Sequence, residues 1–166
     1  MTPAGGIFRP GMRAYFIPFI AGLVLAVSAF LPWVVVGGQS LAGVPDVWAI
    51  WIAGLGALAA VLAMLSLITR KNSRHPLLVI GLFALGIMFL AWRIMPALAG
   101  ERALTISQAF AIVENRPIAD APTAGVGVGI YLGLVASCVL VLFGLTIVVK
   151  RAQTVYTITS PDDDVD

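Results

Sequence analysis

Four long apolar segments, separated by short polar stretches, dominate the hydrophobic pattern of this chain. They cover residues 15–36, 46–69, 76–97 and 124–149. Each is long enough to cross a bilayer, which takes about 20 residues of helix. Water cannot satisfy backbone N–H and C=O groups inside hydrocarbon, so segments of this kind should be helical. The pattern therefore predicts an all-α membrane protein, with a bundle of four transmembrane helices in a domain of residues 1–151.

The composition excludes an ordinary soluble domain. Of the 166 residues, 60% are hydrophobic and 11% are charged, whereas a soluble domain is about half apolar and a quarter charged. The net charge is only +2, and the basic residues lie at the predicted membrane boundaries. We therefore expect the lipid bilayer to be the surroundings of the protein, and we expect no nucleic-acid partner.

The distribution of Lys and Arg around the apolar segments predicts their orientation. One side has seven of these residues: Arg9, Arg13, Arg70, Lys71, Arg74, Lys150 and Arg151. The other side has only Arg93, Arg102 and Arg116. Because cytoplasmic loops are enriched in Lys and Arg, both termini should be cytoplasmic, with the connections at 37–45 and 98–123 outside. The stretch AVSAF at 26–30 faintly resembles a signal-peptidase site, but the apolar run continues past it, which favours a retained anchor.

Two further features fit this topology. Four tryptophans fall near the predicted outer ends of the helices, as in an aromatic belt at a membrane interface: Trp33, Trp48, Trp51 and Trp92. Residues 152–166 are polar and end in four aspartates among five residues. This composition predicts an acidic, disordered cytoplasmic tail.

The second outer connection contains a short helix pattern. TISQ at 105–108 has the spacing of a capping box, in which Thr105 caps the helix and Gln108 reaches back. An apolar stripe with helical spacing follows: Ile106, Ala109, Phe110 and Val113. The sequence therefore predicts a short amphipathic helix at 106–115. It could lie flat on the outer membrane surface, or it could be a lid or a docking surface for a partner.

The glycines around residue 129 have two possible meanings, a phosphate-binding loop or a helix-packing face. They read G-x-G-x-x-x-G, which misses the dinucleotide fingerprint, and no βαβ unit fits between two membrane helices. On a helix, four small residues recur at every fourth position and form a ridge: Gly125, Gly129, Gly133 and Ser137. Gly56 and Ala60 form a similar row in the second segment. Small residues let helices approach closely in lipid, so these are predicted packing faces, against the same chain or against another subunit.

Chemically reactive groups are scarce within the apolar segments. Asp46 and Arg93 lie near the outer ends of neighbouring helices, where they could form an interfacial ion pair or contact a lipid headgroup or a partner. His75 is the only histidine and Cys138 the only cysteine, so the chain alone supplies no obvious haem or metal site. We therefore expect no catalytic residues and no cofactor.

Two short motifs carry a family resemblance. FLPWV at 30–34 and GVGIYLGLVAS at 127–137 resemble segments of small four-helix bacterial inner-membrane proteins. The resemblance implies the four-helix topology and a bacterial plasma membrane, and it carries over no functional residues.

Two functions remain open at this level. The first is a non-enzymatic accessory or scaffold subunit that packs against other membrane proteins in a larger complex. The packing faces, the outer helix and the lack of internal chemistry favour it. The second is a small transporter or channel that acts as a homo-oligomer. Its pathway would depend on a few polar residues: Ser28, Ser66, Ser137, Thr146 and Arg93.

Overall fold

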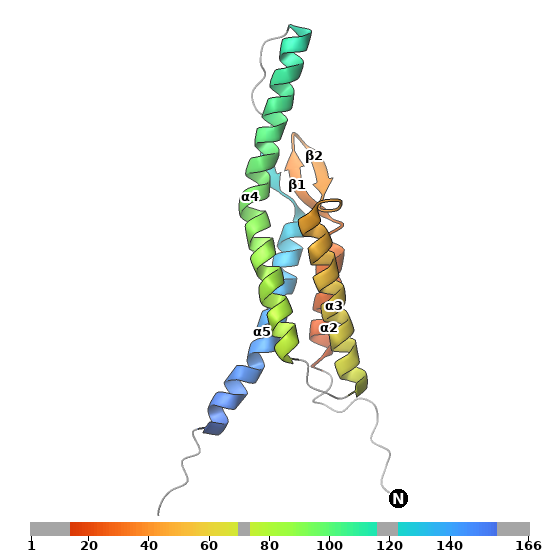
Figure 1. The fold of residues 1–166 in the computed structure, drawn as a ribbon, viewed down its shortest axis with the longest axis vertical. Helices are drawn as coiled ribbons and strands as arrows, with labels where there is room; N and C mark the ends of the chain where they lie inside the picture. Colours follow the sequence, from red (N-terminus) through yellow and green to blue (C-terminus); the bar gives the residue numbers. More distant parts are fainter. Residues whose placement is uncertain (1–13, 70–73, 116–122, 156–166) are drawn as a thin grey trace, which may run out of the picture.

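The computed structural model describes residues 14–69, 74–115 and 123–155 (Figure 1), with all side chains in these ranges except those of residues 74 and 147–155. In chain order the elements are α2 (Phe16–Ser28), β1 (Pro32–Val36), β2 (Gln39–Ala42), α3 (Val47–Thr69), α4 (Arg74–Glu114), β3 (Ala124–Val126) and α5 (Val128–Val155). Among the described residues, three helices are long and apolar enough to cross a membrane, namely α3, α4 and the Val128–Thr146 part of α5. The chain is therefore a mostly helical, multi-pass membrane protein.

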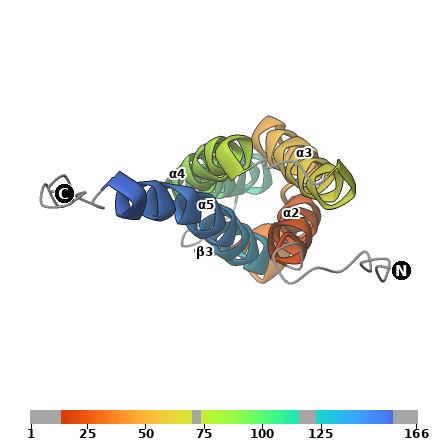
Figure 2. The same cartoon turned by 90° about the horizontal axis from the view of Figure 1, so that it is seen from below.

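The helices form one bundle. α2 packs against both α3 and α5, and α5 packs against α4, as the view along the bundle shows (Figure 2). Fully buried side chains from all four helices and from β1 belong to one hydrophobic core: Leu25, Trp33, Ile52, Leu77, Met88, Ile130 and Leu140. This arrangement buries apolar surface on the inner faces and leaves large apolar side chains on the outer faces, as expected for helices that contact lipid.

The first helix is shorter than the predicted segment 15–36. α2 has 13 residues and is about 20 Å long at 1.5 Å per residue, against a hydrocarbon thickness of about 30 Å. Pro32 has no N–H to donate to the carbonyl of Ser28, so the helix cannot continue through it. The chain turns instead and forms strand β1, which is rich in valine.

The structure also contains a small sheet, which the all-α prediction did not include. It has the order β2-β1-β3, and both pairings are antiparallel. The β1–β2 hairpin turns at Gly37 and Gly38, whose φ angles are 55° and 83°. A two-residue hairpin turn of type I′ needs positive φ at both central positions, which glycine adopts without strain. The predicted outer loop 37–45 therefore contains the hairpin turn and strand β2.

The predicted fourth helix begins later than residue 124. Residues Ala124–Val126 form β3, with Gly125 opposite Val35 of β1. The N–H of Gly127 then donates to the carbonyl of Trp33 (2.7 Å). Pairing with β1 thus holds this segment extended, and α5 starts at Val128. At its other end α5 continues to Val155, into the predicted tail, and residues 156–166 lie outside the described part of the chain.

The third predicted helix and the predicted outer helix at 106–115 are one element. α4 runs without interruption for 41 residues and passes through Pro96, a length of about 60 Å or twice the hydrocarbon thickness. Thr105 does not cap a new helix. Its Oγ1 donates to the carbonyl of Glu101 (2.9 Å). This hydrogen bond to the residue four positions earlier is typical of a threonine in the interior of a helix. The helix ends where the pattern predicted, beside Asn115, whose φ of 51° is typical of a residue that terminates a helix.

One of the four tryptophans is not part of an aromatic belt. Trp48, Trp51 and Trp92 are at least one-third exposed, whereas Trp33 is 1% exposed. Its indole Nε1–H donates to the carbonyl of Ser28 (2.9 Å), which also accepts the N–H of Leu31 (3.3 Å). Gly43 and Gly129 flank the ring, and a Cβ on either glycine would lie within 2.8 Å of an indole atom. The Trp33 side chain therefore fills the buried space at the end of α2.

The α2–α3 crossing depends on close backbone contact at Gly22 and Gly56. A Cβ on Gly56 would collide with the backbone of Ala26, whereas Gly54, on the same helix, has no atom within 4 Å of such a Cβ. We expect Gly56→Ala to lower the free energy of unfolding by about 1–3 kcal/mol, the usual cost of overpacking. Gly54→Ala is the matched control and should be neutral or slightly stabilising. Thermal unfolding in detergent measures both, and equal midpoints for the two variants would contradict the close contact.

Replacement of Trp33 should destabilise the whole bundle. We expect Trp33→Ala to lower the free energy of unfolding by about 3–5 kcal/mol, because it removes a fully buried ring. Trp33→Phe keeps an aromatic ring but removes the indole donor, and it should cost at least about 1 kcal/mol. Trp51→Phe is the control, because the Trp51 side chain is more than half exposed. A Trp33→Phe variant as stable as Trp51→Phe would show that the hydrogen bond to Ser28 contributes nothing.

Candidate functional site

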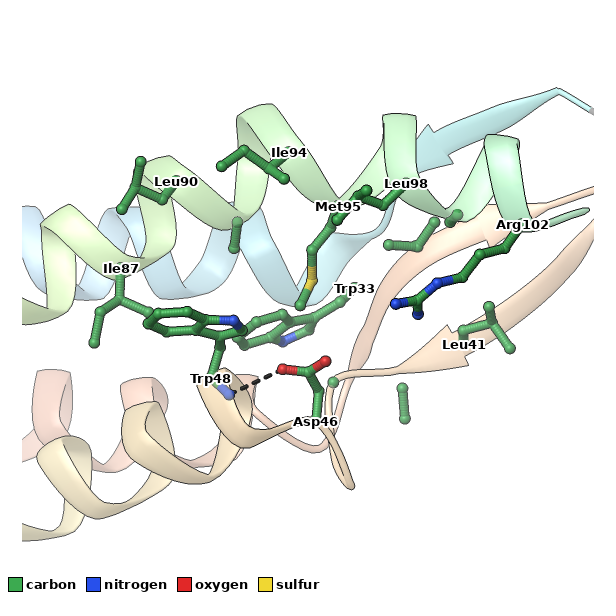
Figure 3. Close-up of a pocket in the computed structure, with 15 residues that line it drawn as sticks. Trp33, Leu41, Asp46, Trp48, Ile87, Leu90, Ile94, Met95, Leu98 and Arg102 are labelled. Carbon is green, nitrogen blue, oxygen red and sulfur yellow. Dashed lines mark hydrogen bonds between the residues drawn. The ribbon is translucent and has the colours of Figure 1, made fainter.

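A cavity of about 390 Å³ lies between the start of α3, the β1–β2 hairpin and the middle of α4 (Figure 3). It forms because α3 and α4 contact each other less extensively than α2 contacts α3 or α5 contacts α4. Pockets that bind small molecules typically have volumes of about 300–1,000 Å³. This space, called the α3–α4 cavity below, is therefore a candidate binding site.

The walls of the α3–α4 cavity are mainly apolar. α4 contributes one wall through Ile87, Leu90, Ala91, Ile94, Met95, Leu98 and Ala99. Trp33 and Trp48 line the side opposite α4, and the Met95 side chain points from α4 into the space between (Figure 3). Such walls favour a guest with an apolar body, because its burial removes hydrocarbon surface from water.

Two opposite charges lie at one end of this cavity. Asp46 is the N-cap residue of α3, and its Oδ1 accepts the backbone N–H of Trp48 (2.9 Å). Arg102 reaches from α4 toward the Asp46 carboxylate (Figure 3). Within the described ranges no ion pair joins the two side chains. The second carboxylate oxygen and the guanidinium are therefore both open to a guest.

Sequence reasoning missed Arg102 as a site residue. Ala91, Met95, Leu98 and Arg102 follow one another at intervals of four, three and four, so they share one face of a continuous helix. The prediction had placed a helix end at residue 97 and Arg102 in a loop. The sequence did not indicate that α4 continues across Pro96. This continuity places Arg102 on the same helix face as the apolar wall.

Asp46 and Arg93 are not brought together as the sequence suggested. Arg93 is exposed and does not line the α3–α4 cavity. It lies two positions from Ala91, which is about 200° around the helix from the cavity wall. No ion pair joins Arg93 to Asp46 in the part of the chain that the structure describes. A contact of Arg93 with a lipid headgroup or a partner stays a prediction.

Most of the predicted packing positions lie against helices of the same chain. A Cβ on Gly129 would lie 2.8 Å from the Ser28 carbonyl oxygen, and one on Gly133 would collide with Met88. Ser137 is buried, and its Oγ donates to the carbonyl of Leu134 (2.9 Å). Gly125 differs, because it belongs to β3 and has no atom within 4 Å of its Cβ position.

The Gly56 row is likewise covered by the chain itself. Gly56 and Ala60 face Gly22 and Ala26 of α2, at backbone-to-backbone distance. Because α2 occupies this row and α4 occupies the Gly133 position, another subunit would have to contact a different surface of the protein.

One such surface lies at the far end of α4. Residues 103–114, called the outer arm below, project past the β-hairpin (Figure 1). The three residues predicted for docking are exposed here: Ile106 at 57%, Phe110 at 62% and Val113 at 83%. Residues 76–92 of α4 contain no charge, whereas Arg93, Glu101, Arg102 and Glu114 follow. This distribution favours a position of the outer arm beyond the hydrocarbon.

The described residues contain no group of three or more His, Cys, Asp or Glu side chains that could hold a metal ion. Cys138 is exposed on α5, far along the chain from the lining of the α3–α4 cavity. The absence of a catalytic function stays a prediction.

Comparison with protein-family models, with curated proteins and with solved structures finds no match to this chain. Its function therefore has to be argued from its own geometry.

Proposed function

We propose that the protein is a non-enzymatic accessory subunit that binds another membrane protein through the outer arm of α4. The observation that carries this proposal is the exposed apolar stripe of Ile106, Phe110 and Val113 on a helix that projects from the bundle. Contiguous apolar surface outside a membrane is typical of protein–protein contact sites. Its partner would present an apolar groove that receives these three side chains at helical spacing.

The continuity of α4 argues against an arm that lies flat on the membrane. A membrane-crossing helix runs roughly along the bilayer normal, with an average tilt of about 20°. The arm continues the same helix, so it points away from the bilayer and lipid cannot cover its apolar stripe. A contact with another protein would remove Phe110 and Val113 from water.

The transporter or channel alternative has less support. A conducting pathway needs polar groups that face a common channel. Ser28, Ser137 and Thr146 each donate a hydrogen bond to a carbonyl three residues earlier in their own helix. Hydroxyls used in this way add no continuous polar lining.

We further propose that the protein resides in a bacterial plasma membrane and crosses it four times, with both termini in the cytoplasm. The support is the distribution of Lys and Arg, together with the resemblance of the FLPWV and GVGIYLGLVAS motifs to segments of small four-helix bacterial inner-membrane proteins. α2 would provide the fourth crossing in spite of its 13 residues, because it packs against α3 and α5 and a bilayer can thin locally around a short helix. The outer arm would then lie outside the cell.

A double substitution tests the docking role. We expect Phe110→Asp with Val113→Asp to lower recovery of a stoichiometric partner by at least about 30-fold, because interface hot spots contribute about 2 kcal/mol or more each. The measurement is native mass spectrometry of the tagged protein, extracted from its native membrane in mild detergent. Gln108→Asp adds a charge at an exposed polar position of the same arm and is the matched control.

Two outcomes would contradict the proposal. One is the same partner at the same ratio with the double variant and with the control. The other is wild-type protein that is a pure monomer or homo-oligomer under gentle extraction. The thermal midpoint of the double variant should equal that of the wild type, which separates loss of docking from loss of folding.

A further inference from the structure

We propose that the α3–α4 cavity binds one phospholipid with a phosphoethanolamine head, whose phosphate contacts Arg102 and whose ammonium contacts Asp46. This site is independent of the proposed docking through the outer arm, because the residues that line it precede residue 103.

The length of the cavity matches one leaflet of a bilayer. Its lining on α4 runs from Ile87 to Arg102, a separation of 15 residues or about 22 Å. Half of a bilayer, with hydrocarbon and headgroups together, measures about 20–22 Å. A lipid whose head lies at Arg102 therefore has one of its two acyl chains beside Ile87, Leu90 and Ile94.

The cavity opens sideways, between α3 and α4, toward the surrounding bilayer. Leu90, Ile94 and Trp48 all line it and are each about half exposed. These residues border the gap between α3 and α4, so an acyl chain can enter sideways from the hydrocarbon. The inner wall, with Trp33 and Ala91, is buried and limits how deep the chain can go.

The charges at the end of the cavity select the head group. The Arg102 guanidinium offers planar donors that suit a phosphate. Asp46 uses Oδ1 to cap α3 and has its second oxygen left for a donor. A purely anionic head would place negative charge beside the Asp46 carboxylate, and a choline head has no N–H to donate. A primary ammonium beside a phosphate satisfies both side chains, which gives phosphoethanolamine the best fit.

Lipid titration of the purified protein tests this proposal. Delipidated full-length protein is mixed with phosphatidylethanolamine, phosphatidylglycerol or phosphatidylcholine of equal chain length, and native mass spectrometry counts the lipids that stay bound. We expect one tightly retained phosphatidylethanolamine, with an affinity about tenfold or more above that of the other two lipids.

Four variants assign the contacts. Arg102→Gln should weaken all three lipids. Asp46→Asn should remove the preference for phosphatidylethanolamine while it keeps α3 capped, because Asn and Asp are equally good N-caps. Ile94→Trp should weaken all three by filling the cavity without a change of charge. Leu82→Trp adds the same bulk at an exposed apolar position of α4 that does not line the cavity, and this variant should bind as the wild type does.

The proposal would be overturned by any of three results. The first is no retained lipid on the wild-type protein. The second is equal retention of the three lipids by the wild type. The third is unchanged binding by both Arg102→Gln and Asp46→Asn, which would mean that the two side chains simply face each other across the cavity. Loss of the membrane partner in the docking experiment is a separate readout and does not depend on any of these.

Discussion

The hydrogen bond from the Trp33 indole to the Ser28 carbonyl holds together the part of the protein where four elements meet. Pro32 has no backbone donor to extend α2, and the indole of the next residue donates to the Ser28 carbonyl alongside the N–H of Leu31. The ring fits only because Gly43 and Gly129 carry no Cβ against it. The end of α2, the segment after β2 and the start of α5 are therefore all positioned around one side chain, which also forms a wall of the α3–α4 cavity.

The unbroken course of α4 has a comparable influence on the possible functions. A helix of 41 residues is about twice as long as the hydrocarbon is thick, so it presents one surface to lipid and another beyond the membrane. Its inner part lines the α3–α4 cavity, and its outer part carries Ile106, Phe110 and Val113. Arg102 lies between these two parts; at the proposed membrane boundary its charge would be tolerated and a headgroup would be within reach.

The candidate site could be predicted only in part. Asp46 was identified because a carboxylate next to an apolar helix is conspicuous, and Phe110 and Val113 were identified from their helical spacing. Arg102 was missed because Pro96 and a capping-box motif suggested that the helix had ended before it. Local signals of this kind state what a segment can do in isolation. They do not include the stabilisation that α4 gains by packing against α5 and the sheet. In the folded protein this stabilisation exceeds the cost of one proline inside the helix.

The sequence by itself determined the features that depend on length and hydrophobicity. These are the membrane-spanning character of the chain, the bounds of α3 to within one residue and the end of α4 beside Asn115. The tertiary structure decided where α2 ends, that a sheet exists and where the cavity lies. Val34 and Val126 pair across 92 positions of the chain, and the cavity is space left between helices. A hydrophobic pattern reflects a few neighbouring residues of the chain. Strand pairing and a cavity between helices depend instead on segments that are distant in the sequence and meet only in the folded protein.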